Sequence, residues 1–185
     1  MEFSELLTKF SQNSKKSICI LRFDSPIGKI VAAGDDNFLY VVVFEDSKNF
    51  EKELRVIADN LSCSFVEKKS KILEQFECEI KDYFDGNLRK FTVPIKTFGT
   101  DFQKEVWKHL LELPYGSTQT YGSLAKNMGR AASHSRAIGA ACGANAHLII
   151  IPCHRLVASA TNGGFSCGVN RKEWLIEHEK KFVKL

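Results

Sequence analysis

A cysteine followed directly by two basic residues is the clearest sign of chemistry in this chain. Cys153 follows Pro152 and precedes His154 and Arg155. A free thiol, with a pKa of about 8.5, is only slightly ionised at neutral pH. An adjacent imidazole and guanidinium favour the thiolate and supply a base, and the proline fixes the direction of the chain at the sulfur. The segment therefore predicts an activated nucleophilic thiol.

The residues before Cys153 indicate how the thiol is positioned. Residues 148–151 are all aliphatic and predict a buried strand that ends at Pro152. A buried cysteine is often an inert core residue, so a Cys-His pair alone is weak support for catalysis. The complete run Ile-Ile-Ile-Pro-Cys-His-Arg is far more specific.

Short helices are expected upstream of this strand. Apolar spacing predicts a helix over residues 102–113, Thr120 is expected to cap one over 121–127, and Ser133 a third that ends near Cys142. The last two, joined by a glycine-containing turn, resemble a helix-turn-helix. The third is rich in Ala and Gly. Two interpretations stay open for it: tight helix packing, or a helix that lies against a nucleic-acid groove.

The first half of the chain shows strand and helix patterns but no catalytic constellation. Residues 1–14 are expected to form a short helix or a loose tail. Aromatic and β-branched runs between turn residues predict an antiparallel meander with a later short strand, and helical spacing predicts two helices. The strands are expected at 17–23, 29–33, 38–44 and 91–95, and the helices at 48–59 and 69–84. The sequence thus predicts an α+β protein with two domains, residues 1–95 and 96–185.

Composition and charge limit the class of protein. With 44% hydrophobic and 26% charged residues, the chain resembles ordinary globular proteins, and no run approaches the roughly 18 apolar residues of a membrane span. The polar start is unlike a secretory signal, so an intracellular location is expected, cytoplasmic or nuclear. Residues 1–90 carry 14 Lys and Arg against 16 Asp and Glu, and residues 91–185 carry 12 against 6. The basic second half suits a phosphate-rich partner or simply aids solubility.

The six cysteines are expected to be free thiols. They stand at irregular spacing without a Cys-x-x-Cys pair, and all five histidines lie in the second half of the chain. Neither a disulfide framework nor a zinc site follows from this distribution. No cofactor and no metal are expected.

The motifs around Cys153 resemble those of the O6-alkylguanine-DNA alkyltransferases, also called methylated-DNA–protein-cysteine methyltransferases. The family's Pro-Cys-His-Arg tetrad stands at residues 152–155. Other family motifs follow the same order along the chain: Gly-Thr-x-Phe-Gln at 99–103, Leu-Pro-Tyr-Gly at 113–116, Arg-Ala-Ile-Gly at 136–139, and Arg-Lys-x-Trp-Leu with a later Glu at 171–179. The N-terminal half matches mainly through residues 24–28. The resemblance implies a ribonuclease-H-like N-terminal domain and a mainly helical C-terminal domain with a helix-turn-helix.

The resemblance also implies an activity and its catalytic residues. A damaged guanine is flipped out of duplex DNA, and the thiolate of Cys153 takes its alkyl group irreversibly. His154 matches the residue that deprotonates Cys153 through a water, and Glu179 the carboxylate that polarises His154. Glu173 and Glu177 are rivals for the last role. O6-methylguanine is the expected substrate, with O4-methylthymine as a further candidate.

Other positions match residues that contact the DNA. Arg136 matches an arginine that fills the gap left by the flipped base, and small residues at Ala137 and Gly139 suit a helix in the minor groove. Ser133 is expected beside them. Tyr121 matches a tyrosine that crowds the target phosphate and protonates the departing guanine. The resemblance implies alkylated double-stranded DNA as the partner. The protein is expected to bind it as a monomer and not to associate with a membrane.

The resemblance places further residues at the pocket. Asn145 is expected to hydrogen-bond near the thiol, whereas Arg155 is expected to be structural and to pair with a carboxylate or carbonyls. The backbone N–H of Ser166 is expected to contact O6, and the carbonyls of Cys153 and Leu156 to accept from the guanine amino group.

This chain departs from the usual family pattern at the pocket loop. The loop at 158–162 is slightly short, Phe165 stands where many members have Tyr, and Cys167 stands where many have Gly. These differences predict a tighter pocket that accepts methyl readily and benzyl-sized groups poorly.

Three other classes compete with this interpretation. A non-catalytic lesion-recognition protein of the same fold would lack the acceptor, but Cys153 is present. A Cys-His hydrolase would leave the helix-turn-helix unexplained. A transcription factor would make the cysteine incidental. Without a cysteine cluster for an added metal domain, repair alone is expected.

Overall fold

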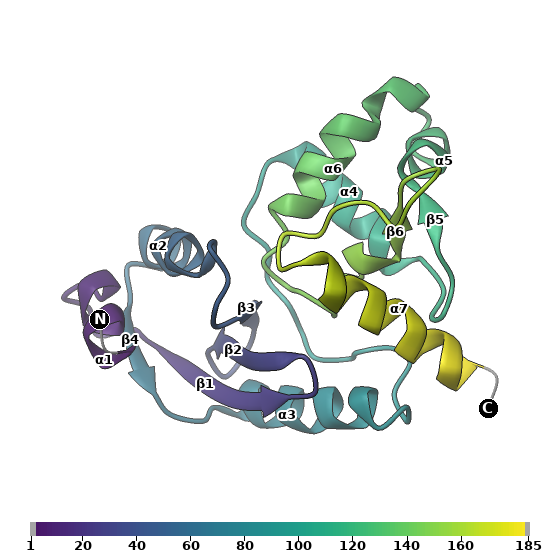
Figure 1. The fold of residues 1–185 in the computed structure, drawn as a ribbon. Coiled ribbons are helices and arrows are strands. Elements are labelled where there is room, and N and C mark those ends of the chain that lie inside the picture. Colours follow the sequence, from purple (N-terminus) through teal and green to yellow (C-terminus); the bar gives the residue numbers. More distant parts are fainter. Residues whose placement is uncertain (1–2, 184–185) are drawn as a thin grey trace. The chain divides into compact units, whose positions relative to one another are not determined.

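The structure, a computed structural model that describes residues 3–183, forms two compact units, residues 1–98 and 99–185 (Figure 1). Helices and a small sheet make up the chain, which confirms the predicted α+β class. In the described part, no helix has the length and hydropathy needed to span a membrane.

The first unit is built on a four-stranded sheet with the order β3-β2-β1-β4. Its strands are β1 Ser17–Ser25, β2 Gly28–Gly34, β3 Leu39–Phe44 and β4 Ser64–Glu67. The first three form the predicted antiparallel meander. β4 pairs with β1 in parallel. Sequence analysis missed it because four residues give too short a pattern.

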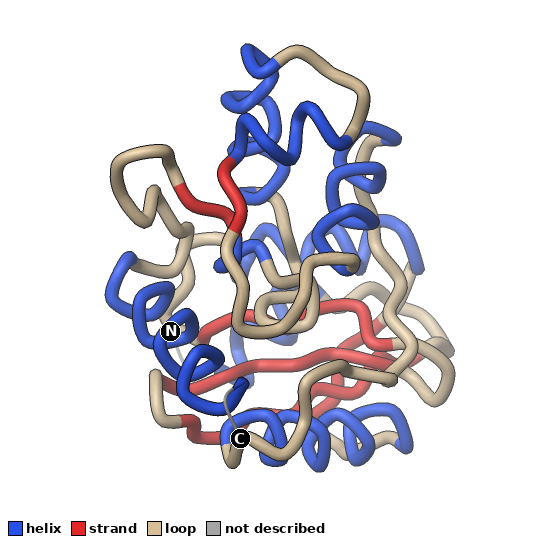
Figure 2. Tube along the Cα trace, turned by 90° about the vertical axis from the view of Figure 1, so that its right-hand side faces the viewer, coloured by secondary structure: helices blue, strands red, loops and turns tan. Residues whose placement is uncertain are grey.

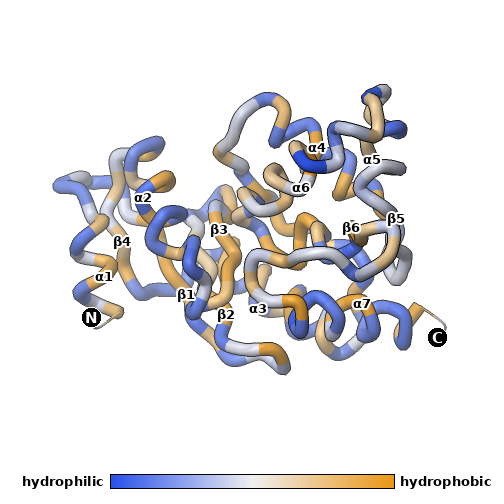
Figure 3. Tube along the Cα trace, turned by 45° about the horizontal axis from the view of Figure 1, so that its top comes forward, coloured by the Kyte–Doolittle hydropathy of each residue, from blue (hydrophilic) through white to orange (hydrophobic). Residues whose placement is uncertain are grey.

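The core of this unit follows from strand hydropathy and turn chemistry. Every residue of β3 is buried, and Figure 3 shows the strand as hydrophobic. At the turn between β1 and β2, Ser25 pairs with Gly28, which has a φ of 123°. Glycine tolerates this conformation because it lacks a Cβ.

Helices α1 Phe3–Phe10, α2 Phe50–Leu61 and α3 Lys71–Phe84 pack around this sheet. α3 begins after the cap Ser70, whose side chain accepts a hydrogen bond from the N–H of Leu73. The helix runs beneath the strands in the view of Figure 2.

The strand predicted at residues 91–95 is wrong. Only a single bridge, between Leu39 and Ile95, forms there. The N–H of Leu39 donates to the carbonyl of Pro94 at 2.8 Å. Pro94 has no N–H to return, so it interrupts any longer ladder.

The second unit is mainly helical. It contains α4 Asp101–Leu111, α5 Tyr121–Asn127, α6 Ser135–Gly143 and α7 Val169–Val183, together with the short parallel strands β5 Gln119–Thr120 and β6 Leu156–Val157. α4 and α6 are joined by a hydrogen bond of 2.9 Å from Trp107 Nε1 to the carbonyl of Ala141. A Cβ on Gly99 would lie 2.7 Å from the Trp107 ring, so this position needs a glycine.

Two of these helices begin at side-chain caps, of which Thr120 is the predicted one. Thr100 and Gln103 form a reciprocal capping box at α4, and Thr120 caps α5. The predicted cap at Ser133 is wrong: Ser133 lies within a 3-10 turn, η1 Ala132–His134, and α6 starts after His134. The 3-10 turn supplies a backbone hydrogen bond where a side-chain cap was expected.

The strand predicted over residues 148–151 is also wrong, because these residues form consecutive turns. Ile149 has a φ of 73°, outside the extended region, and the N–H of Ile151 donates to the carbonyl of His147 at 2.9 Å. All four aliphatic residues are buried. A run of aliphatic residues indicates burial but does not by itself indicate a strand. Here a backbone N–H donates within the segment instead of to a neighbouring strand.

Candidate active site

Cys153 begins a 3-10 turn, η2 Cys153–Arg155, and its side chain is buried with only 3% exposed. Asn145 fixes the approach to it. The side-chain Nδ2 of Asn145 donates to the carbonyl of Ile151 at 2.9 Å and to Cys153 Sγ at 3.2 Å. Its Oδ1 accepts from the N–H of His147 at 2.8 Å. One amide therefore holds both the turns before the thiol and the sulfur itself.

His154 is fully buried and is oriented by Glu179. Its Nε2 lies 2.8 Å from Glu179 Oε1, so Nε2–H donates and Nδ1 carries the lone pair. Among the described residues, Nδ1 is buried without a hydrogen-bond partner. Burial lowers the pKa of His154, against the opposing effect of Glu179. A neutral imidazole with a free lone pair is suited to accept a proton.

Glu179, on α7, is itself anchored by Arg155. The guanidinium donates from Nε at 2.8 Å and from a terminal nitrogen at 3.0 Å, and the N–H of Gly116 donates to the same carboxylate at 3.0 Å. Burial would raise the pKa of Glu179, but the bonds and charges of His154 and Arg155 hold it well below its usual value. The carboxylate therefore stays ionised near neutral pH.

The guanidinium of Arg155 pairs with this carboxylate. Its Nη1 also donates a hydrogen bond to the carbonyl of Leu113 at 2.6 Å. The sequence suggested that an adjacent arginine would favour the thiolate directly, and the geometry gives that guanidinium another partner. The rival carboxylates lie on the exposed side of α7: Glu177 pairs with Lys180, and Glu173 accepts from Asn162.

Burial has the largest effect on the pKa of the Cys153 thiol. It raises the pKa of Cys153 to about 11, against the opposing effects of the Asn145 hydrogen bond and the charge of Lys172. The thiol is therefore protonated at rest. A base must therefore remove the thiol proton during the reaction. The neutral imidazole of His154, the next residue in the sequence, is suited to this role.

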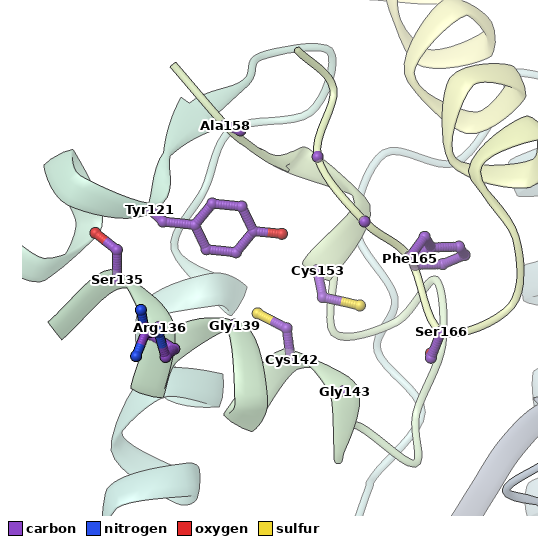
Figure 4. A pocket seen from close by; sticks show the side chains of 12 residues that line it. Tyr121, Ser135, Arg136, Gly139, Cys142, Gly143, Cys153, Ala158, Phe165 and Ser166 are labelled. Atoms are coloured by element: carbon purple, nitrogen blue, oxygen red, sulfur yellow. The ribbon is translucent and has the colours of Figure 1, made fainter. Parts of the chain in front are cut away.

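A pocket of about 560 Å³ opens onto Cys153. Figure 4 shows the hydroxyl of Tyr121 directed toward Cys153, whose sulfur points to the side of Phe165 and Ser166. The wall is formed by α5, α6 and the loop before α7, through Tyr121, Ser135, Arg136, Gly139, Cys142, Gly143, Cys153, Ala158, Gly163, Gly164, Phe165 and Ser166.

The residues that line this wall differ from the predicted ones at Leu156, Cys167 and Cys142. Leu156 and Cys167 are buried but do not line the pocket; Cys167 Sγ lies 3.8 Å from Ser166 Oγ. Cys142 was not foreseen. It follows Gly139 by three positions, so helical spacing places both on one face of α6 and offered a usable signal.

The outer surface of α6 continues from this pocket. A second hollow of about 830 Å³ shares Ser135 and Arg136 with it and is otherwise lined by Ala132, Ser133, His134, Ala137 and Ala140. Arg136 and Ala137 are exposed. Small side chains with one long cation thus form a continuous surface that leads to the thiol.

Tyr121 remains a proton donor in this environment. Burial raises the pKa of its hydroxyl to about 12, and the thiols of Cys142 and Cys153 add to the shift. Within residues 3–183, no cluster of three or more histidine, cysteine or acidic side chains could hold a metal ion. The chemistry available from these residues is thiol nucleophilicity with proton transfer.

Residues 101–181 match the family model of the 6-O-methylguanine DNA methyltransferase DNA-binding domain. The methylated-DNA–protein-cysteine methyltransferase of Methanosarcina acetivorans is 40% identical over 158 residues, which cover 85% of this chain and 95% of that protein.

Solved structures show the same fold over most of the chain. Mycobacterium tuberculosis O6-methylguanine methyltransferase has a TM-score of 0.74 and 32% identity, covering 89% of this chain and 93% of that one. Mycobacterium tuberculosis OGT in complex with DNA gives 0.75 and 32%, covering 90% and 94%. The chain belongs to the methylated-DNA–protein-cysteine methyltransferase family.

Proposed function

We propose that this protein repairs duplex DNA by moving the alkyl group from O6 of guanine to Sγ of its own Cys153. The S–C bond forms as the C–O6 bond breaks, and no cofactor takes part. The thiol proton passes through a water to Nδ1 of His154, and Tyr121 protonates the departing guanine. The observation that carries the proposal is the buried Glu179–His154 pair, next in sequence to Cys153, which lines the pocket.

Base flipping follows from the position of the thiol. Cys153 is buried at the end of a pocket, and a stacked base cannot reach it. In the proposal α5 and α6 act as a helix-turn-helix, with α6 in the minor groove. Ala137, Gly139 and Ser133 allow the close approach, and Arg136 occupies the gap left by the base.

Guanine is recognised in the proposal by backbone groups. The N–H of Ser166 donates to O6, while the carbonyls of Cys153 and Leu156 accept from the amino group. The Leu156 carbonyl also accepts a hydrogen bond from Lys172 Nζ at 2.5 Å, and a carbonyl oxygen has two lone pairs. Residues 96–185 form the DNA-binding and alkyl-acceptor domain, and residues 1–95, with a ribonuclease-H-like fold, support it.

The reaction is proposed to occur once per molecule, by a monomer. A thiolate is a poor leaving group from an alkyl carbon, so the thioether formed at Cys153 is not cleaved and the free thiol is not regenerated. O4-methylthymine is a second candidate substrate, since it also carries a methyl group on an exocyclic oxygen. Duplex DNA with a labelled methyl on guanine O6 tests the proposal: the label should become covalently bound to protein. Label released into solution as a small molecule would support a hydrolase instead.

Arg136→Ala is expected to slow transfer from duplex DNA at least about tenfold while the reaction with free O6-methylguanine changes little. The arginine acts only where a base must be replaced in the stack, a step that costs a few kcal/mol. Single-turnover rates on both substrates measure the effect. Arg136→Lys keeps the charge and controls for loss of phosphate attraction. Equal slowing on both substrates would contradict the assigned role.

The pocket is expected to react with methyl in preference to benzyl. Phe165 and Cys142 line the pocket that opens onto the thiol, and overpacking such a site costs about 1–3 kcal/mol. We expect O6-benzylguanine to inactivate the protein at least about tenfold more slowly than O6-methylguanine in DNA. Loss of activity over time with each compound measures this. Equal rates would show that the pocket is not restrictive.

A further inference from the structure

The loop between β6 and α7, residues 158–168, is held by three consecutive residues near the start of α7. Their hydrogen bonds reach three different points of the loop: Arg171 Nη1 donates to the carbonyl of Cys167 at 3.1 Å, Lys172 Nζ donates to the carbonyl of Gly164 at 3.1 Å, and Glu173 Oε1 accepts from Asn162 Nδ2 at 3.3 Å. Because consecutive side chains of a helix project about 100° apart, the loop wraps around the start of α7.

The hydrogen bonds within this loop are short in range. The N–H of Gly163 donates to Thr161 Oγ1 at 3.2 Å, and the N–H of Gly168 donates to the carbonyl of Phe165 at 3.0 Å. Residues 158–168 are all described, and none of them lies in a helix or strand. A segment without regular structure opens at a low cost in free energy. The side chains of α7 therefore have a large part in fixing the path of this loop.

The same loop forms the side of the pocket toward which the Cys153 sulfur points. The residues of the loop that line the pocket are Ala158, Gly163, Gly164, Phe165 and Ser166. Figure 4 shows the sulfur pointing to the side of Phe165 and Ser166, so an alkyl group on the sulfur must fit beside the loop. The lining run 163–166 lies directly between Asn162 and Cys167, which α7 holds. The positions of these two residues therefore determine the width of the pocket at the sulfur.

We propose that Arg171 and Glu173 are positioning residues that set the size of the alkyl group accepted by Cys153, because they hold the loop at Cys167 and Asn162. Neither Arg171 nor Glu173 lines the pocket itself. Loss of either hydrogen bond lets one end of the lining run move away from the sulfur. The pocket then widens for a benzyl group, while the thiol and its base are unchanged. The inference rests on the proposed role of Cys153 as the alkyl acceptor.

The free bases O6-methylguanine and O6-benzylguanine test the inference, because neither has to be flipped out of DNA. The rate at which each base alkylates Cys153 is followed by peptide mass spectrometry. Arg171→Ala and Glu173→Ala remove the two hydrogen bonds, whereas Arg171→Lys and Glu173→Gln keep a donor and an acceptor. Glu177→Ala, at an exposed position of the same helix, is the matched control. Lys172 is left unchanged because it is fully buried and its replacement would disturb the fold.

We expect the ratio of the benzyl rate to the methyl rate to rise about fivefold in Arg171→Ala and in Glu173→Ala, the effect of one hydrogen bond. The ratio should match that of wild type in Glu177→Ala and stay within about twofold of it in the two conservative variants. Iodoacetamide, a small reagent from which the Cys153 sulfur displaces iodide, should react at the wild-type rate in every variant. That result would show that the thiol and its surroundings are intact.

An unchanged ratio in both alanine variants would overturn the inference, and so would an equal rise in Glu177→Ala. A general loss of packing slows the reactions with both bases alike, which leaves the ratio unchanged and counts against the inference. The wild-type protein distinguishes this failure from failure of the proposed function. If neither base alkylates wild-type Cys153, the transfer reaction itself is refuted. If wild type is alkylated and the variants keep its ratio, only the role of Arg171 and Glu173 is refuted.

Discussion

Cys153→Ala is expected to abolish transfer of a labelled methyl group from duplex O6-methylguanine to the protein. No other thiol near the pocket has the same combination of contacts. Cys142 also lines the wall, but burial raises the pKa of its thiol strongly. The proposed general base, His154, is adjacent to Cys153 in sequence. Without the acceptor sulfur, the expected rate is that of the uncatalysed background.

The matched control is Cys142→Ala, which removes the other pocket thiol. Its transfer rate can differ from that of wild type, but the reaction should still run to completion with the label on the peptide that contains Cys153. Both proteins are incubated with the same labelled duplex, digested and mapped. Label on Cys153→Ala protein, or label found on Cys142 in wild type, would contradict the assignment.

Glu179→Gln is expected to reduce the transfer rate about 100-fold or more, the usual range for loss of general-base function. Glutamine fits the same space but lacks the charge that orients His154 and balances the proton it receives. Single-turnover transfer from methylated duplex DNA measures the loss. Glu177→Gln, an exposed position on the same helix, should retain wild-type activity. Equal losses of the transfer rate in both variants would show that Glu179 has no specific role in the reaction.

The same variant should be destabilised by about 3–5 kcal/mol near neutral pH, because it leaves Arg155 unpaired in a buried site. Since the folded pKa of Glu179 is depressed, its stabilisation is complete above the unfolded pKa of about 4.3. That stabilisation disappears as the pH falls from there toward the folded value. Urea unfolding of both proteins should therefore show a difference that shrinks below about pH 4. A constant difference at all pH values would contradict the ionised carboxylate.

The sequence predicts the strand meander and the helix cap at Thr120, because those signals are local. The side chain of Thr120 caps its helix by accepting from a backbone N–H three residues later. The aliphatic run at 148–151 shows the limit of this approach. Its hydropathy correctly indicates burial, but its backbone is turned by a side-chain amide, that of Asn145, several residues away. Hydropathy contains no information on such a bond.

In the candidate site too, local sequence signals identify some residues and not others. The motif identifies Cys153 and His154 directly, whereas Glu179 lies 25 residues from His154 and was reached only through the family resemblance. Lys172 escaped notice because a lysine in an amphipathic helix normally faces solvent. Only tertiary packing shows that its head group ends between two carbonyls beneath the pocket.

Counting labels per molecule tests the central claim most directly. A known amount of protein is incubated with a large excess of duplex DNA carrying labelled O6-methylguanine until transfer stops, and the modified peptide is identified. The proposal predicts that transfer ends at one label per active molecule, all of it on Cys153. Continued consumption of methylated guanine beyond that ratio, or label on any other residue, would contradict irreversible transfer to Cys153.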